Sequence, residues 1–139
     1  MIVRDFATFE SDLESLERTG VDDESAPGSL IAARLVSRLR QAGAEVSHDV
    51  TPWEGYAWEF GVRSGRVIVT CVLQASDSWL LITRPGRSLL DRIRGRDFSD
   101  EHQSVCLAVD EVLRNDPEVR NVRWYTRSEF EGTGRPGAQ

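Results

Sequence analysis

The stretch that decides the fold is YAWEFGVRSGRVIVTCVLQASDSWLLIT, residues 56–83. Apolar residues alternate with other residues along its three segments, and a period of two is typical of β-strands. Ser64-Gly65 and Ser76-Asp77 separate the segments, and these residue types favour tight turns. The stretch therefore predicts an antiparallel meander.

The turns also predict which residues face one another. A two-residue turn at Ser64-Gly65 pairs apolar residues with apolar residues along the first hairpin, for example Phe60 with Val69. A second two-residue turn places Leu80 beside Leu73. The buried face of the meander is then expected to contain Tyr56, Trp58, Phe60, Val62, Val67, Val69, Cys71, Leu73, Leu80 and Ile82.

The opposite face of the predicted meander also carries apolar side chains, where a one-sided antiparallel sheet normally carries polar ones. These side chains are Ile68, Val72, Trp79 and Leu81. They need a cover, which is a helix, a loop or another chain. We therefore expect a partner-binding surface on this face.

Helical and strand patterns flank the meander. Apolar residues recur every three to four positions over 6–16, 30–39 and 105–113, which predicts helices. Alternation predicts further strands at 44–50 and 119–126. The expected fold class is α+β, in the order α-α-β-β-β-β-α-β, with helices packed on one face of an antiparallel sheet.

Length and composition are those of a globular domain. The chain has 139 residues, of which 40% are hydrophobic and 29% are charged. We expect residues 1–130 to form a single α+β domain and residues 131–139 to be a disordered C-terminal tail. The sequence shows neither a signal-peptide pattern nor an apolar run long enough to span a membrane, so the expected location is the cytoplasm.

The charge balance bears on the partner. A net charge of −6 disfavours DNA, whose phosphates need a basic surface, and favours a basic partner protein. Acidic residues concentrate near the N-terminus, where a solvated helix face is the simpler interpretation. The acidic candidates for partner binding are Glu14, Glu17, Asp22 and Asp23.

No catalytic residue, metal ligand or cofactor is predicted. His48 and His102 are the two histidines, and neither has the neighbours of a catalytic triad or a metal site. Cys71 and Cys106 are expected to be buried free thiols. Glu59 is expected to form a cross-strand ion pair with an arginine. An enzyme of unfamiliar type stays open as a hypothesis, with Glu59 or His48 at its site.

A second surface suggests a ligand site. Trp53 lies in a predicted loop, and five arginines gather in a chain that is otherwise acidic: Arg84, Arg87, Arg92, Arg94 and Arg96. These residues predict, as the alternative function, a binder of a small anionic ligand, a nucleotide or a lipid headgroup. A solvated linker that pairs with the acidic N-terminal segment explains the same arginines.

The leading hypothesis is a non-catalytic protein-binding module. A short acidic chain with helices against a meander resembles, in architecture, small bacterial toxin-immunity proteins and secretion chaperones. The expected order departs from the usual secretion-chaperone arrangement, because two helices precede the sheet and one strand follows the last helix. The resemblance implies another protein as the partner, or a second copy in a homodimer.

Overall fold

The computed structural model describes residues 3–16, 26–86, 95 and 97–134. Six antiparallel strands form one sheet in the order β2-β3-β4-β5-β1-β6. The strands are β1 (Phe6–Ser11), β2 (Glu45–Trp53), β3 (Ala57–Ser64), β4 (Val67–Ala75), β5 (Trp79–Pro85) and β6 (Val119–Tyr125). The helices are α1 (Ser29–Gln41), α3 (Ser99–Arg114), α4 (Arg127–Glu129) and the π-helical turn η2 (Phe130–Gly134).

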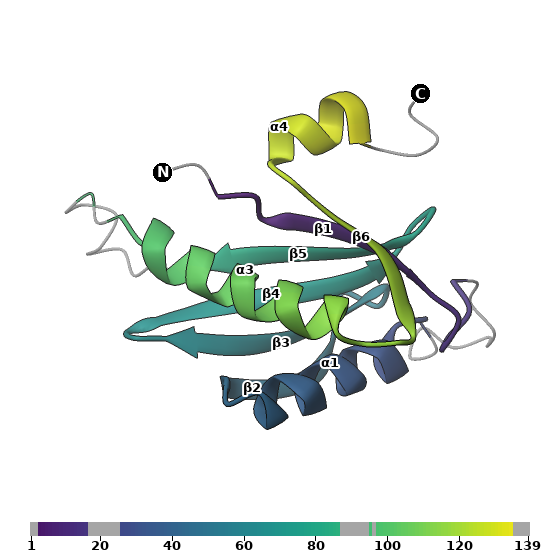
Figure 1. Cartoon of the computed structure of the whole chain (residues 1–139), viewed down its shortest axis with the longest axis horizontal. Helices are drawn as coiled ribbons and strands as arrows, with labels where there is room; N and C mark the ends of the chain where they lie inside the picture. The colour runs from purple at the N-terminus through teal and green to yellow at the C-terminus, as the bar shows by residue number, and fades with distance from the viewer. Residues whose placement is uncertain (1–2, 17–25, 87–94, 96, 135–139) are drawn as a thin grey trace.

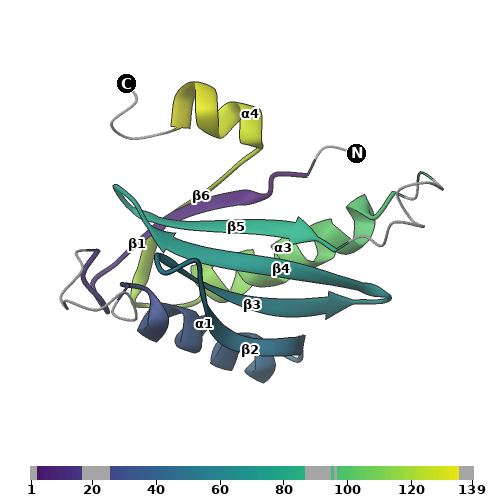
Figure 2. The same ribbon diagram turned by 180° about the vertical axis from the view of Figure 1, so that it is seen from behind.

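The α+β class and the antiparallel meander are confirmed, as is the order of elements from α1 to β6. Helices α1 and α3 lie on the same face of the sheet, as expected (Figure 1). Figure 2, the view from behind, shows the opposite face of the sheet with the two helices beyond it. The apolar stripe of α1 is buried against β2 and β3 and that of α3 against β3, β4 and β5, with Leu39 and Leu113 fully enclosed. Each enclosed leucine contributes about 1.5–3 kcal/mol through burial.

The first predicted element is the exception, because residues 6–11 form a strand rather than the start of a helix. β1 lies between β5 and β6, with Ala7 and Phe9 buried against the helix side. The alternation of Phe6, Thr8 and Glu10 with Ala7 and Phe9 fits a strand as well as the spacing of the phenylalanines fits a helix. Pairing with two neighbouring strands decided between them.

The register of the second hairpin corrects the prediction for β5. Its loop has three residues, because Ala75 pairs with Trp79, and this one-residue difference reverses the two faces of β5. Trp79 is 1% exposed and Leu81 is 0% exposed, so both belong to the core rather than to a partner-binding face. Leu80 and Ile82 take the opposite face instead.

The first hairpin also differs, without changing its faces. Ser64 pairs with Val67, so the turn is at Gly65 and Arg66, and Phe60 faces Cys71 rather than Val69. This shift of two residues keeps every inward side chain of β3 and β4 inward, because the side-chain period of a strand is two. Tyr56 precedes β3 and is 47% exposed, so it is not part of the expected core.

The C-terminal segment continues further than predicted. Helical geometry extends through η2 to Gly134, where a tail without structure was expected from Glu131. Phe130 is buried, and its ring lies 5.5 Å from that of Phe6 and 6.0 Å from that of Tyr125. This aromatic contact holds α4 beside β1 and β6, beyond that edge of the sheet (Figure 2).

One ion pair ties α1 to the turn between α3 and β6. Asp116 is 4% exposed and accepts two hydrogen bonds from the Arg34 guanidinium, at 2.6 and 2.8 Å. Its Oδ1 also accepts a bond from the Glu118 backbone N–H, and Arg38 lies 3.5 Å away. The Arg34 hydrogen bonds are the largest cause that lowers the pKa of Asp116 below its ordinary value.

We predict that Asp116→Asn lowers the free energy of unfolding by about 1–3 kcal/mol at neutral pH, because charge-assisted hydrogen bonds to a buried group are lost. A carboxylate with a lowered folded-state pKa stabilises the fold above its unfolded pKa and stops doing so as the pH falls through the folded value. The difference between the variant and the parent should therefore shrink below pH 3.8. Urea unfolding at several pH values measures it.

The control is Asp12→Asn. In the parent, Asp12 forms a solvent-exposed ion pair with Arg120, and this pair should contribute little to the free energy of unfolding. Equal losses in the two variants would contradict the assigned role of Asp116.

Candidate functional site

A trough runs across the helix-free face of the sheet, between the β2–β3 turn and β5. Its pocket has a volume of about 340 Å³. We name it the sheet trough, and its lining residues are Trp53, Tyr56, Glu59, Thr70, Val72, Gln74, Ile82 and Arg84. Figure 2 shows this face of the sheet toward the viewer, with α1 and α3 behind it.

The aromatic wall of the trough is built by the β2–β3 turn. Glu54 and Gly55 have positive φ angles of 55° and 78°, which turns the chain back on itself. Trp53 and Tyr56 flank these residues, and their rings lie 5.5 Å apart at an interplanar angle of 78°. The turn thus holds two rings nearly perpendicular at one end of the trough.

The floor follows from the register of the central strands. Glu59 pairs with Val72, and Val72 pairs in turn with Ile82, so these side chains form one row across β3, β4 and β5. Thr70 pairs with Arg84 in the adjacent row. The floor is therefore apolar at its centre and polar around it.

The polar side chains of the trough form no hydrogen bond or ion pair with the described residues, although the charge of Arg84 acts on Asp5. Among the described residues, none of Glu59, Thr70, Gln74 and Arg84 has a side-chain hydrogen bond or ion pair. The ion pair predicted for Glu59 is thus not formed there, although Arg63 on the same face binds Glu45 at 2.8 Å. The trough therefore presents acceptors and donors that are free to bind another molecule.

The structure divides the predicted apolar partner-binding residues. Val72 lines the trough, and Ile68 lies half-buried on the same face. Trp79 and Leu81 lie in the core instead, for the reason given by the β4–β5 register. Ile82 supplies the apolar surface that had been assigned to them.

The acidic candidates do not form a surface within the described residues. Glu14 accepts hydrogen bonds from the backbone N–H groups of Gly28, Leu30 and Ile31, at 2.9, 3.1 and 3.3 Å. It caps the N-terminus of α1 from 14 residues upstream, where a negative charge also favours the helix dipole. Glu17, Asp22 and Asp23 lie outside the described residues.

The alternative ligand site is brought together in part. Trp53 and Arg84, far apart in sequence, line the same trough. Arg87, Arg92, Arg94 and Arg96 lie outside the described residues. Sequence reasoning missed Tyr56 as a site residue, because it began the strand alternation at Tyr56, directly after Gly55, and so assigned this residue to the core. A glycine next to an aromatic residue was the signal for a turn at that point.

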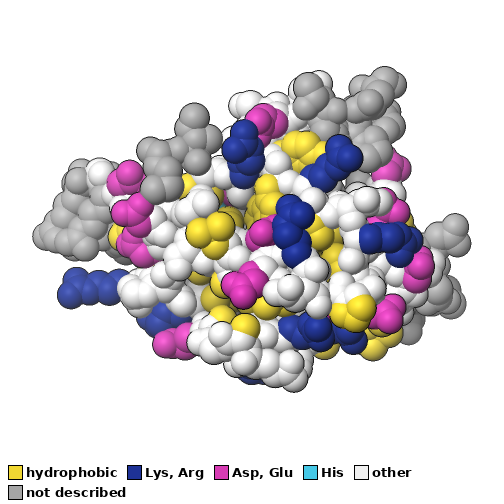
Figure 3. Space-filling view, in the orientation of Figure 1, with side chains coloured by type: hydrophobic (Ala, Val, Ile, Leu, Met, Phe, Trp, Pro, Cys, Tyr) yellow, Lys and Arg dark blue, Asp and Glu magenta, His cyan; other side chains and the backbone are white. Residues whose placement is uncertain are grey.

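A larger pocket of about 650 Å³ lies where β1 meets β6. Several of its polar side chains bind one another: Arg120 lies 3.2 Å from Asp12 and 3.6 Å from Glu10, and Asn121 donates to Glu10. On the helix side, acidic and arginine side chains are interspersed and hydrophobic ones form small separate groups (Figure 3). The sheet trough is therefore the better candidate site.

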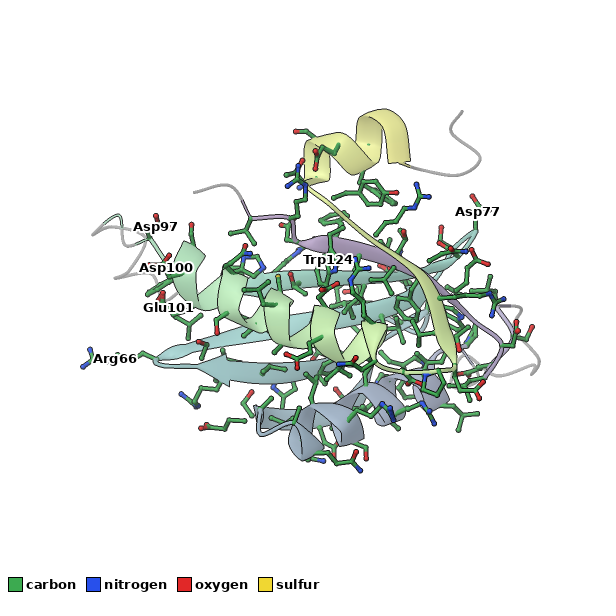
Figure 4. All side chains as sticks on the ribbon, in the orientation of Figure 1. Arg66, Asp77, Asp97, Asp100, Glu101 and Trp124 are labelled. Carbon is green, nitrogen blue, oxygen red and sulfur yellow. The ribbon has the colours of Figure 1, made fainter. Side chains whose placement is uncertain are left out.

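Acidic side chains also gather at one end of α3, where Figure 4 labels Asp97, Asp100 and Glu101. Asp97 accepts the backbone N–H of Ser99 at 2.9 Å, and the other two lie in the first helical turn. Such residues stabilise the positive end of the helix dipole, which explains them without a ligand. Trp124, labelled in the same view, donates its indole N–H to Asp110 at 2.8 Å.

The histidines and cysteines lie apart from the trough lining. His102 Nε2 lies 2.7 Å from Thr83 Oγ1, which also lies 3.4 Å from Cys106 Sγ. Because Thr83 donates its hydrogen to the Asp5 carbonyl, His102 Nε2 is the donor to Thr83. Burial raises the pKa of Cys106 to about 11, so its thiol stays protonated at neutral pH.

Cys71 and Cys106 are free and buried, as predicted. His48 is exposed on β2, and its ring lies over Gly61, where a Cβ would collide with it. The close approach of this ring explains the glycine in the middle of β3.

Within the described part of the chain, no cluster of three or more His, Cys, Asp or Glu side chains has the arrangement of a metal site. None of the helices described is long and apolar enough to cross a membrane. No protein-family model, curated protein or solved structure matches this chain.

We predict that His102 makes stability fall as the pH drops below the ordinary histidine pKa of 6.5. Burial lowers the pKa of His102, so the unfolded chain binds the proton more readily than the folded one. Stability is therefore full above the ordinary value of 6.5 and falls as the pH drops toward the folded-state value. As the pH drops, the urea concentration at the unfolding midpoint should decrease less steeply for His102→Gln than for the parent.

His48→Gln, which removes the exposed histidine, is the matched control. An unchanged slope in His102→Gln would assign the pH dependence to another group.

Proposed function

We propose that this protein is a non-catalytic binding module that holds a segment of a partner protein in the sheet trough. The observation that carries the proposal is the set of polar side chains that form no hydrogen bond or ion pair with the described residues, placed around an apolar floor and an aromatic wall. These groups are partly or fully exposed, so they can exchange water for hydrogen bonds to a bound molecule. A bound segment would supply them.

The composition of the trough fits a protein interface. Tyrosine and tryptophan are enriched among the residues that contribute most to binding energy, and Trp53 and Tyr56 are accessible to a partner. Val72 and Ile82 supply apolar surface between the polar groups. The net charge of −6 favours a basic partner over an acidic one. A toxin or secreted protein bound by an immunity-like or chaperone-like module is such a partner.

We predict that Val72→Glu abolishes association with this partner, because it places a charge in the apolar centre of the trough beside Glu59. The tagged full chain is recovered from a native lysate of its source organism, and bound proteins are identified by mass spectrometry. A protein recovered in stoichiometric amount with the parent should fall at least about tenfold with the variant.

Leu107→Glu is the control, because Leu107 is 58% exposed on α3, which packs on the other side of the sheet. Circular dichroism verifies that both variants fold. The proposal fails if no protein is recovered in stoichiometric amount, or if both variants lose it equally. Recovery of a second copy of the chain instead would assign the trough to a homodimer.

A small anionic ligand is the second candidate, because Trp53 and Arg84 line the same pocket of about 340 Å³. This volume lies in the range of small-molecule sites. An aromatic ring and a guanidinium together suit a nucleotide or a phosphorylated headgroup, through stacking and ionic hydrogen bonds.

We predict for this candidate that a nucleotide, inorganic phosphate or an anionic lipid headgroup raises the melting temperature of the parent and not that of Arg84→Gln. Binding to the folded state alone stabilises it by about 2.7 kcal/mol at a ligand concentration 100 times the Kd. A thermal-shift series with these probes decides the question, and no shift with any of them rules the candidate out.

A further inference from the structure

We infer that Trp53, Tyr56 and Glu59 form a binding site for one basic side chain, a lysine or an arginine, of the partner protein. The inference rests on the proposed function and names the chemistry that the trough recognises. We call these three residues the cation corner. They line one pocket, and they come from the β2–β3 turn and the strand that follows it.

The aromatic geometry suits a cation. The rings of Trp53 and Tyr56 lie 5.5 Å apart at 78°, an edge-to-face contact rather than a stacked pair. The face of an aromatic ring carries negative charge density and attracts ammonium and guanidinium groups. The ring faces outside this contact stay available to a cation, because both residues line the pocket and Tyr56 is 47% exposed to solvent.

Glu59 supplies the counter-charge. Trp53 pairs with Ala57, and Glu59 pairs with Thr51, so Glu59 is a diagonal neighbour of Trp53 on the same face of β2 and β3. Its carboxylate is half-buried and has no ion-pair or hydrogen-bond partner among the described residues. A carboxylate that is partly removed from water binds a cation more strongly than one on an open surface. Gln74 and Thr70 offer acceptor oxygens for the remaining N–H groups.

Arg84, the arginine among the lining residues, does not fill the cation corner. It lies on β5, two strands from Glu59, which corresponds to about 9–10 Å at the usual strand spacing. The two side chains form no ion pair. Arg84 nevertheless adds a positive charge to the same pocket. It should weaken the binding of another cation, whereas an anion would need it.

The chemistry of the trough favours a side chain of a protein over a free amine. The pocket is open along its floor, where Val72 and Ile82 extend beyond the corner and offer apolar surface to the residues that flank the bound one. A small alkylammonium ion fills the corner and leaves this floor uncovered. The net charge of −6 adds a general attraction for a basic protein segment.

The test measures binding of simple probes to the full chain by NMR. The probes are Nα-acetyl-lysine amide, Nα-acetyl-arginine amide and the neutral Nα-acetyl-norleucine amide. Binding is followed by the chemical shift of the Trp53 indole N–H, which is assigned with Trp53→Phe. The Kd of each cationic probe should be at least about tenfold lower than that of the neutral probe. Equal affinity for the three probes would overturn the inference.

Variants separate the cation corner from the anion site. Glu59→Gln should weaken the cationic probes about tenfold while it keeps the size of the side chain. Arg84→Gln should leave their binding unchanged or strengthen it, and a loss of binding in this variant would contradict the inference. The indole and amide spectra show directly whether each variant is folded.

The peptide Ala-Ala-Lys-Ala-Ala and n-butylammonium distinguish the source of the cation. The peptide should bind more tightly, because its flanking residues cover the floor. Equal affinity would assign the corner to free amines and overturn the assignment to a protein. If Val72→Glu loses the co-purified partner while Glu59→Gln retains it in full, binding of the partner in the sheet trough is supported and the cation corner is refuted. If no partner is recovered but the probes bind as expected, the proposed function fails alone.

Discussion

The pairing of β4 with β5 is the constraint on which both faces of the sheet depend. Because Ala75 pairs with Trp79 across a three-residue loop, Trp79, Leu81 and Thr83 point toward the helices. The same pairing sends Ile82 and Arg84 to the helix-free face, where they meet Val72 and Thr70. One residue fewer in that loop would exchange the two sets, removing the largest buried side chain from the core and the arginine from the trough.

The two faces of the sheet consequently differ in how well their polar groups are satisfied. On the helix side, the hydroxyl of Thr83 bonds the Asp5 carbonyl and lies within hydrogen-bonding distance of His102 and Cys106. At the edge of the same layer, Asp116 holds Arg34 in a two-bond ion pair. The trough has no comparable internal network among the described residues. The trough's polar side chains are only partly buried, so a bound molecule can reach them, whereas the polar groups of the core are enclosed by the helices.

The candidate site was predictable only in fragments. Trp53 and Arg84 were singled out by residue type, and Val72 by its place on the second face of the meander. Tyr56 was assigned to the core because its alternation with Trp58 continued the strand pattern, whereas the positive φ angles at Glu54 and Gly55 end that pattern. Glu59 was expected to pair with an arginine, since sequence shows charges but not which strand brings them together.

The sequence by itself determined the α+β class, the antiparallel meander and the apolar stripes of α1 and α3, because local periodicity records which side of an element is buried. Only the tertiary structure decided that residues 6–11 form a strand, since that segment fits two periods and its hydrogen-bond partners lie some 70 and 110 residues away. It also decided the register of β5, because Trp79 and Leu81 are as apolar as Leu80 and Ile82 and the pattern has no preference between them. The cation corner instead follows from the β2–β3 turn, whose positive φ angles at Glu54 and Gly55 are not visible in the alternation of apolar residues.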